Sequence, residues 1–305
     1  MYNSPRKIVN LFSFCMFLKK TFLSLLFLGV AALSSLNSCN EQETGCSFFG
    51  LWGDEPQTTE IHTLQDLVGK RAGELTGSIF HSVLQARQPG VAEYPQFIQS
   101  QLLVNALLTG KIDVVLEDEP IAQYIAAFYP EDLYVAFTYA DDHYSFATRK
   151  GDPLNARISA VIQQLEQSGV LSEFKKKWCQ SSDQNRHITK WTHKKDYDGS
   201  AGTIRYATYP VQEPMVYHAY NELLGMDIET INRVAYELNM KVEYSFMDFS
   251  QLLDALQNGQ ADLVGGCMSV TPERQQKVDF VHPYYKGGMA VLARYAKQQE
   301  APKAK

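Results

Sequence analysis

The sequence predicts an α/β fold, because one helix–strand unit occurs twice in it. The phrase ALLTGKIDVV at residues 106–115 is matched by ALQNGQADLV at residues 255–264, with Ala-Leu, Gly and Asp at the same offsets. Each copy has apolar residues at helical spacing, a glycine that ends the helix and a short apolar run typical of a buried strand. Helices that alternate with buried strands are the building units of layered α/β domains.

The second copy continues into a stretch that is typical of a ligand site. Residues 265–269, Gly-Gly-Cys-Met-Ser, form a loop of small residues where the backbone can approach a ligand. Thr271 and Pro272 then predict the start of a helix, with Thr271 as N-cap and Pro272 at the first helical position. The order strand, small-residue loop and helix start therefore predicts a site at the loop.

Arg274 is unusual at this place, because a cation in the first helical turn opposes the helix dipole. Its position is explained if arginine and helix N-terminus share an anionic partner. A ligand carboxylate fits, held by the guanidinium, by free backbone N–H groups and by the Ser269 hydroxyl. The alternative is an ordinary solvated arginine near a helix start.

Residues 252–285 resemble, almost word for word, the first lobe of the periplasmic amino-acid-binding proteins, which are solute-binding family 3 of ABC transporters. The resemblance continues back to Gly202, through a first strand at 204–208, a turn into a helix at 224–228 and a strand at 241–246. The family's other segments lie upstream, at residues 66–73, 76–78, 145–150 and 154–178. The resemblance implies a two-lobed, type II periplasmic-binding-protein-like fold with a ligand cleft between the lobes.

The family's second half comes first in this chain, which indicates a circular permutation. We expect a signal peptide at 1–39, a tether at 40–60, lobe 2 at 61–142, the closing part of lobe 1 at 143–180, a joining linker at 181–200, the main part of lobe 1 at 201–297 and a polar tail at 298–305. This order predicts one covalent crossover between the lobes, near residues 137–145, and one cut crossover. A monomer is expected; a dimer with swapped halves and a chain cut from a longer tandem gene are the alternatives.

The N-terminus resembles the signal of bacterial lipoproteins. Lys19 and Lys20 precede an apolar run at 22–33, and Leu-Asn-Ser-Cys at 36–39 resembles a lipobox. This pattern predicts a lipid-modified Cys39 that anchors the protein in the bacterial cell envelope, on the periplasmic or extracytoplasmic side. A transmembrane helix is the alternative, although the run is short for one, and Met16 is an alternative start.

Composition excludes several other functions. The formal net charge of -6 and the lack of a basic aromatic stretch argue against nucleic acid as a partner. Of five cysteines, Cys15 would be removed with the signal and Cys39 lipidated. An odd number, three, remains, so no disulfide framework is implied. No spacing of ligands indicates a metal site or a cofactor, and no arrangement of nucleophile and base indicates an enzyme.

An α-amino acid needs a cation and N–H donors for its carboxylate and an anion for its ammonium. The resemblance implies that Arg274 and Ser269 bind the carboxylate. It implies that Ser78, beside Gly77, adds a hydroxyl from a helix N-terminus on lobe 2. It also implies that Asp118, which follows the strand at 112–116, binds the ammonium. From the residues alone, Ser78 could be a plain N-cap and Asp118 a solvated acidic turn.

Four further residues are candidates for contact with the ligand. The resemblance implies that Phe249 packs on the ligand side chain, with core packing as the alternative. Cys267 stands where the family has a small residue that offers its backbone carbonyl. Gln212 occupies the family's aromatic position in the first loop, so that Tyr209 either supplies the aromatic contact from nearby or the contact is missing.

The expected function is capture of an amino acid by hinge closure and its delivery to an ABC permease in the membrane. A dehydratase on the same fold is one alternative, with Glu213 or Glu117 as the acid or base. A sensor or scaffold that has lost transport is the other.

Overall fold

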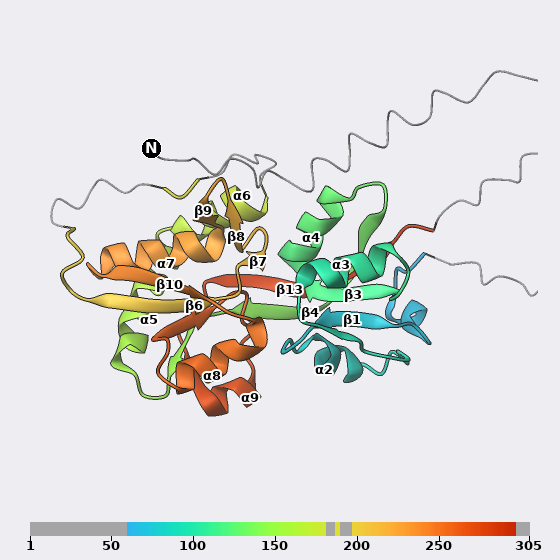
Figure 1. The fold of residues 1–305 in the computed structure, drawn as a ribbon, viewed down its shortest axis with the longest axis horizontal. Helices are drawn as coiled ribbons and strands as arrows, with labels where there is room; N and C mark the ends of the chain where they lie inside the picture. The colour runs from blue at the N-terminus through green and yellow to red at the C-terminus, as the bar shows by residue number, and fades with distance from the viewer. Residues whose placement is uncertain (1–59, 181–186, 190–196, 297–305) are drawn as a thin grey trace, which may run out of the picture. The chain divides into compact units, whose positions relative to one another are not determined.

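Two five-stranded mixed sheets form the framework of the structure, each covered by helices on both faces (Figure 1). The computed structural model describes residues 60–180, 187–189 and 197–296, all within one unit that spans residues 56–305. The predicted signal peptide with Cys39, nearly all of the tether, most of the joining linker and the polar tail lie outside the described residues. The predicted two-lobed α/β architecture is confirmed.

The sheet of lobe 1 has the strand order β10-β6-β11-β5-β12. Its strands are β10 (Lys241–Phe246), β6 (Thr203–Thr208), β11 (Leu263–Gly265), β5 (Ala147–Arg149) and β12 (Val278–Phe280). One face is covered by α5 (Pro153–Gln167), α6 (Val170–Cys179) and α7 (Met226–Glu237). The other carries the 3-10 helix η2 (Phe249–Gln251), α8 (Leu252–Gln257) and α9 (Pro272–Lys277). A small meander of β7 (Val211–Gln212), β8 (Val216–Ala219) and β9 (Glu222–Leu224) completes this lobe.

The sheet of lobe 2 has the strand order β2-β1-β3-β13-β4. Its strands are β2 (Gln96–Phe97), β1 (Ala72–Leu75), β3 (Val114–Asp118), β13 (Tyr285–Arg294) and β4 (Leu133–Tyr144). One face packs on the 3-10 helix η1 (Leu64–Leu67) and α2 (Phe80–Gln85). The other packs on α3 (Ser100–Leu108) and α4 (Glu119–Phe128).

Apolar residues on both sides of each strand account for the two covered faces. In β3, Val114 and Leu116 belong to the hydrophobic cluster under α2, whereas Val115 belongs to the cluster under α3. Successive side chains of a strand point to opposite faces, so a continuous apolar run fills two cores at once. This is why the apolar runs of the sequence are not alternating.

The repeated sequence phrase folds into the same structure in each lobe. In lobe 2 the guanidinium of Arg71 binds both carboxylate oxygens of Asp113, at 3.0 and 3.0 Å, and the Gly110 carbonyl at 2.9 Å. In lobe 1 Arg205 binds Asp262 at 2.9 and 2.6 Å and the Gly259 carbonyl at 2.8 Å. The shared Gly and Asp of the repeat are therefore held by an arginine, which lies directly before β1 in lobe 2 and within β6 in lobe 1.

Two strands, and not one, cross between the lobes. β4 and β13 pair antiparallel from Tyr144 opposite Tyr285 to Leu133 opposite Arg294. Their tyrosine ends lie in the lobe 1 core, whereas Val291 lies in the lobe 2 core. The prediction of one cut crossover is therefore wrong. The predicted assignment of all of residues 201–297 to lobe 1 is also wrong at its end, because β13 continues into the lobe 2 sheet.

The first and last described segments meet on lobe 2, at Tyr134. The Tyr134 hydroxyl accepts a hydrogen bond from the Ile61 N–H at 2.7 Å and donates to the Ile61 carbonyl at 3.0 Å. Its ring lies against the Tyr295 ring, with centroids 4.7 Å apart. Both ends of the described chain therefore lie on lobe 2, and neither interrupts β4 or β13.

Replacement of Gly225 by alanine is expected to destabilise the protein by more than about 3 kcal/mol. Gly225 has φ +120, and a Cβ there would lie 2.0 Å from the Met215 carbonyl oxygen. Gly151→Ala is the control, since φ is +70 but nothing lies within 4 Å, and about 1–2 kcal/mol is expected there. Urea unfolding midpoints measure both; equal losses would contradict the close approach at Gly225.

Candidate ligand-binding site

Seven of the nine predicted ligand-binding residues line one small cavity where the lobes meet. The cavity has a volume of about 10 Å³, which is roughly the room that one water molecule needs. Lobe 2 contributes Leu75, Ser78, Ile79, Phe80, Glu117 and Asp118. Lobe 1 contributes Gln212, Phe249, Cys267, Ser269 and Arg274.

Arg274 lies in the first turn of α9, as predicted, and Thr271 caps this helix by accepting a hydrogen bond from the Arg274 N–H. The guanidinium is buried. Its Nη1 donates to the Ser269 carbonyl at 3.0 Å, and its Nη2 reaches across to the Gly77 carbonyl of lobe 2, also at 3.0 Å. Burial lowers the pKa of Arg274, and nearby Asp142 and Asp118 oppose that shift. Arginine remains charged under these conditions.

Ser78 does not begin a helix, so that prediction is wrong. α2 starts at Phe80, with Ile79 at the N-cap. The Ser78 hydroxyl instead donates to the buried carboxylate of Glu74 at 2.8 Å. Gly77 has φ +87, and a Cβ there would lie 2.9 Å from the Ser250 Cα of lobe 1. The loop at 76–78 is therefore a point of close contact between the lobes.

Asp118 lies at the end of a strand and not in a turn after it. β3 extends from Val114 to Asp118, two residues beyond the predicted strand, and α4 begins directly afterwards. The Asp118 Oδ1 is buried and has no hydrogen-bond partner among the described residues. Burial, followed by the charges of Glu117 and Asp142, holds the pKa of Asp118 well above its usual range.

Glu117 is the neighbour of Asp118 in the wall of the cavity. Its Oε1 accepts the Asp118 N–H at 3.0 Å, and burial raises its pKa to about 7. From the sequence, Glu117 was a candidate only for the acid of a dehydratase. Both residues line the cavity because β3 continues to Asp118 and ends there.

Asp142 was missed in the sequence. Its Oδ2 accepts a hydrogen bond from the Ser269 hydroxyl at 2.7 Å, and its Oδ1 accepts the His143 N–H at 2.7 Å. Burial raises the pKa of Asp142. In the structure, Asp142 and Tyr144 are the inward positions at this end of β4, while residues 141 and 143 are exposed. A carboxylate on the inward side of a strand indicates a polar site.

The first loop contributes one residue to the cavity. Gln212 lines it, and its Oε1 has no partner in the described part of the chain. Tyr209 does not line the cavity; its hydroxyl accepts the Ser100 N–H of lobe 2 at 3.2 Å. Tyr209 therefore joins the lobes, and no aromatic residue of this loop reaches the cavity.

Phe249 and Cys267 close the lobe 1 side. The Phe249 ring centre lies 5.7 Å from the guanidinium carbon of Arg274, a separation at which a cation interacts with a ring. The Cys267 thiol is buried, which holds its pKa well above the usual range. A thiol in this state is a weak nucleophile.

Asp227 holds the loop that carries Cys267 and Ser269. Its Oδ2 accepts the N–H groups of Gly266 and Cys267 at 3.1 and 3.3 Å. The side chain is completely buried, and burial raises its pKa to about 7. Asp227 lies in the first turn of α7, so this helix positions the site loop.

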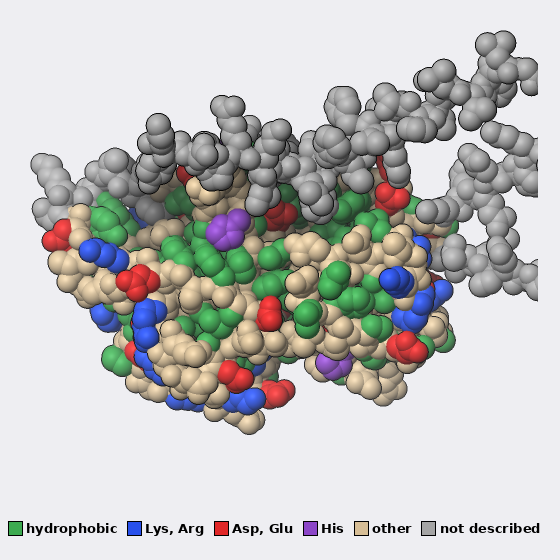
Figure 2. Space-filling model, in the orientation of Figure 1, with side chains coloured by type: hydrophobic (Ala, Val, Ile, Leu, Met, Phe, Trp, Pro, Cys, Tyr) green, Lys and Arg blue, Asp and Glu red, His purple; other side chains and the backbone are tan. Residues whose placement is uncertain are grey.

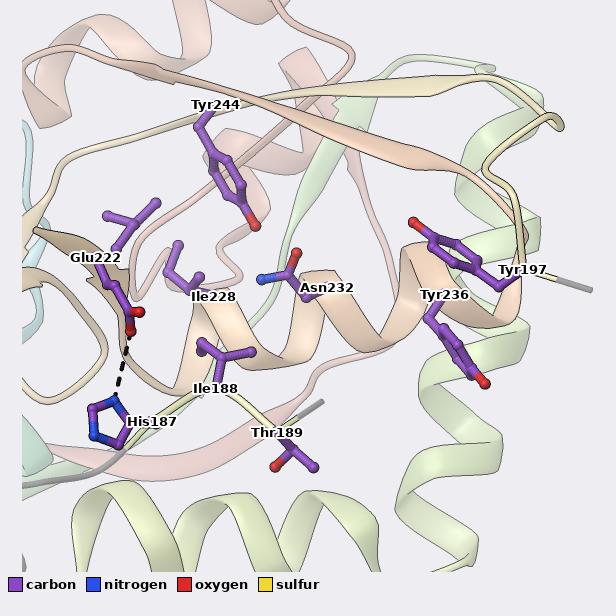
Figure 3. Close-up of a pocket in the computed structure, with 10 residues that line it drawn as sticks. His187, Ile188, Thr189, Tyr197, Glu222, Ile228, Asn232, Tyr236 and Tyr244 are labelled. Carbon is purple, nitrogen blue, oxygen red and sulfur yellow. Dashed lines mark ion pairs between the residues drawn. The ribbon is translucent and has the colours of Figure 1, made fainter. Parts of the chain in front are cut away.

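A second, wider pocket of about 730 Å³ lies between α7 and residues 187–189 (Figure 3). Ile228, Asn232 and Tyr244 form part of its wall, and His187 pairs with Glu222 at 3.6 Å at its edge. No predicted site residue lines it. Residues 187–189 in the wall of this pocket are flanked in the sequence by residues outside the described ranges. We therefore locate the candidate site in the interlobe cavity, which predicted site residues line.

On the face shown in Figure 2, basic and acidic side chains lie among one another. Within residues 60–180, 187–189 and 197–296, no group of three or more His, Cys, Asp or Glu could hold a metal ion. No helix in that part of the chain has the length and apolar character to cross a membrane.

Residues 204–301 match the model of the family described as bacterial extracellular solute-binding proteins, family 3. Over these residues the chain is similar to these solute-binding proteins. Similar proteins include a probable histidine-binding protein of Campylobacter jejuni, 32% identical over 83 residues, which are 27% of this chain and 32% of that protein. The arginine-binding extracellular protein ArtP of Bacillus subtilis is 33% identical over 82 residues, 27% of this chain and 32% of that protein.

The curated relatives match a limited part of the chain. ABC transporter arginine-binding protein 1 of Escherichia coli is 32% identical over 29% of this chain and 35% of that protein. The chain thus spans about a third of the length of these solute-binding relatives. Among solved structures, a polar amino acid ABC uptake transporter substrate binding protein from Streptococcus thermophilus is 30% identical over 27% of this chain and 31% of that chain, with a TM-score of 0.25. A mutant of ArgBP from T. maritima is 16% identical over 75% and 83%, with a TM-score of 0.38.

The buried Asp227 predicts that stability falls as pH rises through 7. In the unfolded chain its carboxyl loses the proton near pH 3.8, whereas the folded protein keeps it up to about pH 7. Between these values the folded state binds more protons, so the free energy of unfolding decreases with rising pH. Buried Tyr206, Tyr284 and Cys267 face Asp227, and they stay neutral over this range because their pKa values are raised.

Urea unfolding at pH 5 and pH 8 tests this expectation. Asp227→Asn should show a smaller fall between the two pH values, although not a zero fall, since Glu117 also titrates near 7. Asp254→Asn, which removes an exposed acid from α8, is the control and should keep the parent slope. Equal slopes in all three proteins would contradict the assignment.

Proposed function

We propose that this protein is an extracytoplasmic solute-binding protein that captures an amino acid between its two lobes for uptake by an ABC permease. The observation that carries the proposal is the meeting of Arg274, Ser269 and Asp118 at one interlobe cavity. They come from an α9 helix start, the loop before it and the end of β3. A cation, a hydroxyl and an anion are what the two charged groups of an α-amino acid require.

The ligand carboxylate is assigned to Arg274 and the Ser269 hydroxyl. To bind it, Arg274 exchanges its contact with the Gly77 carbonyl for the carboxylate, and Ser269 exchanges its bond with Asp142. The ammonium is assigned to Asp118, and Ser78 and Phe249 complete the wall. Charge-assisted hydrogen bonds of ~1.5–3 kcal/mol each make a micromolar Kd, near about -8 kcal/mol, reasonable.

Binding requires the lobes to separate, because the cavity holds about 10 Å³ in this arrangement. Two hydrogen bonds join the lobes beside it, from Arg274 to the Gly77 carbonyl and from the Ser100 N–H to Tyr209. β4 and β13 are the connection about which the lobes can turn. A ligand with contacts on both lobes favours the closed state.

The proposal includes a circular permutation, with the family's second half first. Two observations support it: the two ends of the described chain meet at Tyr134 on lobe 2, and both crossing strands are uninterrupted. Permutation is tolerated where new ends lie outside the packed core. The names of the similar proteins, which refer to histidine, arginine and ABC transporters, support an amino acid ligand and a permease partner. No catalytic residue is assigned.

Arg274→Ala is expected to abolish amino acid binding while the protein stays folded. The change removes the cation that the ligand carboxylate needs, and the expected loss of affinity is at least about a hundredfold. Calorimetric titration of the purified full chain with the common amino acids measures it. Arg233→Ala, which removes an arginine paired with Glu237 on α7, is the control. Retained affinity in Arg274→Ala would exclude this site.

Cys39→Ala is expected to release the protein from the membrane fraction. Cys39 lies outside the described residues, and its proposed lipid chain is the anchor of the protein in the cell envelope. Fractionation of cells that express the full chain, with Cys46→Ala as control, measures the effect. An unchanged membrane fraction in Cys39→Ala would contradict lipidation at this residue.

A further inference from the structure

The interlobe cavity is surrounded by more negative than positive side chains. Glu117 and Asp118 line it, and Asp142 lies behind Ser269. The three side chains are 4%, 2% and 6% exposed, and Arg274 at 7% is the cation among them. In the described part of the chain, no Lys, Arg or His lies within ion-pair distance of any of these three carboxylates. Three carboxyl groups therefore share the surroundings of the cavity with one guanidinium.

A fourth buried carboxylate, Glu74 of lobe 2, has several hydrogen-bond donors around it and serves as a comparison. Glu74 lies completely buried on β1 and accepts hydrogen bonds from the Ser78 hydroxyl and the His81 N–H, both at 2.8 Å. It also contacts the His81 ring and the Gln96 amide. Glu117, by contrast, accepts one bond, from its neighbour's N–H. The described residues thus supply partners for Glu74 that they do not supply for Glu117.

Two buried polar atoms at the cavity wall point to a missing partner. The Asp118 Oδ1 and the Gln212 Oε1 have no hydrogen-bond partner in the described part of the chain. Both are acceptors, and both residues line the cavity from opposite lobes. A buried acceptor without a donor costs about 1–3 kcal/mol. Donors from a ligand would remove that cost.

The lobe 2 wall of the cavity combines apolar side chains with a carboxyl group. Leu75, Ile79 and Phe80 are its apolar members, and Glu117 lies with them. An aliphatic chain that ends in a cation can bury its methylene groups on such a wall while its charged end meets the carboxylate. The wall therefore has the composition that a basic side chain requires.

We infer that the ligand is an amino acid with a cationic side chain, and that Glu117 is the residue that recognises this second positive charge. The inference rests on the proposed function and names its ligand class. Arg274 takes the carboxylate, Asp118 the α-ammonium and Glu117 the side-chain cation, so that each of these two carboxyls, ionised when the ligand is bound, gains a positive partner. Burial raises the pKa values of Glu117, Asp118 and Asp142, a destabilisation that a bound cation reverses.

The test compares arginine with citrulline, which has nearly the same shape and no side-chain charge. Calorimetric titration of the purified full chain should give a Kd for arginine at least tenfold below that for citrulline. Lysine against norleucine repeats the comparison with a different cation. These measurements use the unaltered protein, so they do not depend on any variant that folds poorly.

Glu117→Gln tests the assigned residue. It keeps the size of the side chain and removes the charge, so the ratio of the citrulline Kd to the arginine Kd should fall at least fivefold. Glu119→Gln is the matched control, because Glu119 is two residues away, on the first turn of α4, and does not line the cavity. It should keep the parent preference. Thermal melting of both variants confirms that they are folded.

Each outcome separates the inference from the proposed function. Equal affinity for arginine and citrulline in the parent protein overturns the inference and leaves an amino acid receptor in place. A preference for arginine that Glu117→Gln does not reduce overturns the role of Glu117. A folded protein that binds none of the amino acids overturns the proposed function itself, and the inference with it.

Discussion

The antiparallel pair of β4 and β13 is the constraint on which the rest of the structure depends. Its register joins Tyr144 to Tyr285 at one end and Leu133 to Arg294 at the other, so that both lobes share one antiparallel ladder, with register shifts after Met289 and after Val291. Tyr144 and Tyr285 stack with ring centres 5.1 Å apart where the ladder enters lobe 1. Because a shift of one residue would move every side chain to the opposite face, this register fixes Asp142 beside Ser269 and sets where the lobes can meet.

The cavity beside this pair concentrates charge where burial makes charge costly. Arg274 and the three carboxylates around it lie out of water, and transfer of ionised groups into such a place is unfavourable unless they are paired. The protein reduces the cost in part, by proton uptake at Glu117 near pH 7 and by backbone contacts to the guanidinium. A ligand with complementary charges can offset the remaining free-energy cost of burying these groups. In this view the same groups limit stability and supply affinity.

Local sequence signals were sufficient for some parts of the site and misleading for others. The N-cap Thr271 and the helix start that presents Arg274 follow from residue types alone, and the structure has them as predicted. The helix start at Ser78 was wrong, because a buried partner, Glu74, takes the hydroxyl that would have capped a helix. Asp142 was missed, because its neighbour Ser269 is 127 residues away and no local pattern connects them.

The sequence by itself determined the α/β class, the repeated helix–strand unit and the helix start that presents Arg274, because periodicity, turn residues and caps act over a few positions. Residues 204–301 carry the similarity to the family 3 solute-binding proteins. Only the tertiary structure decided that both crossings are uninterrupted, that Tyr209 joins the lobes and that Asp118 and Asp142 lie near Arg274. These depend on strand register and on contacts between distant segments, which are fixed when the two sheets pack and not by any local pattern.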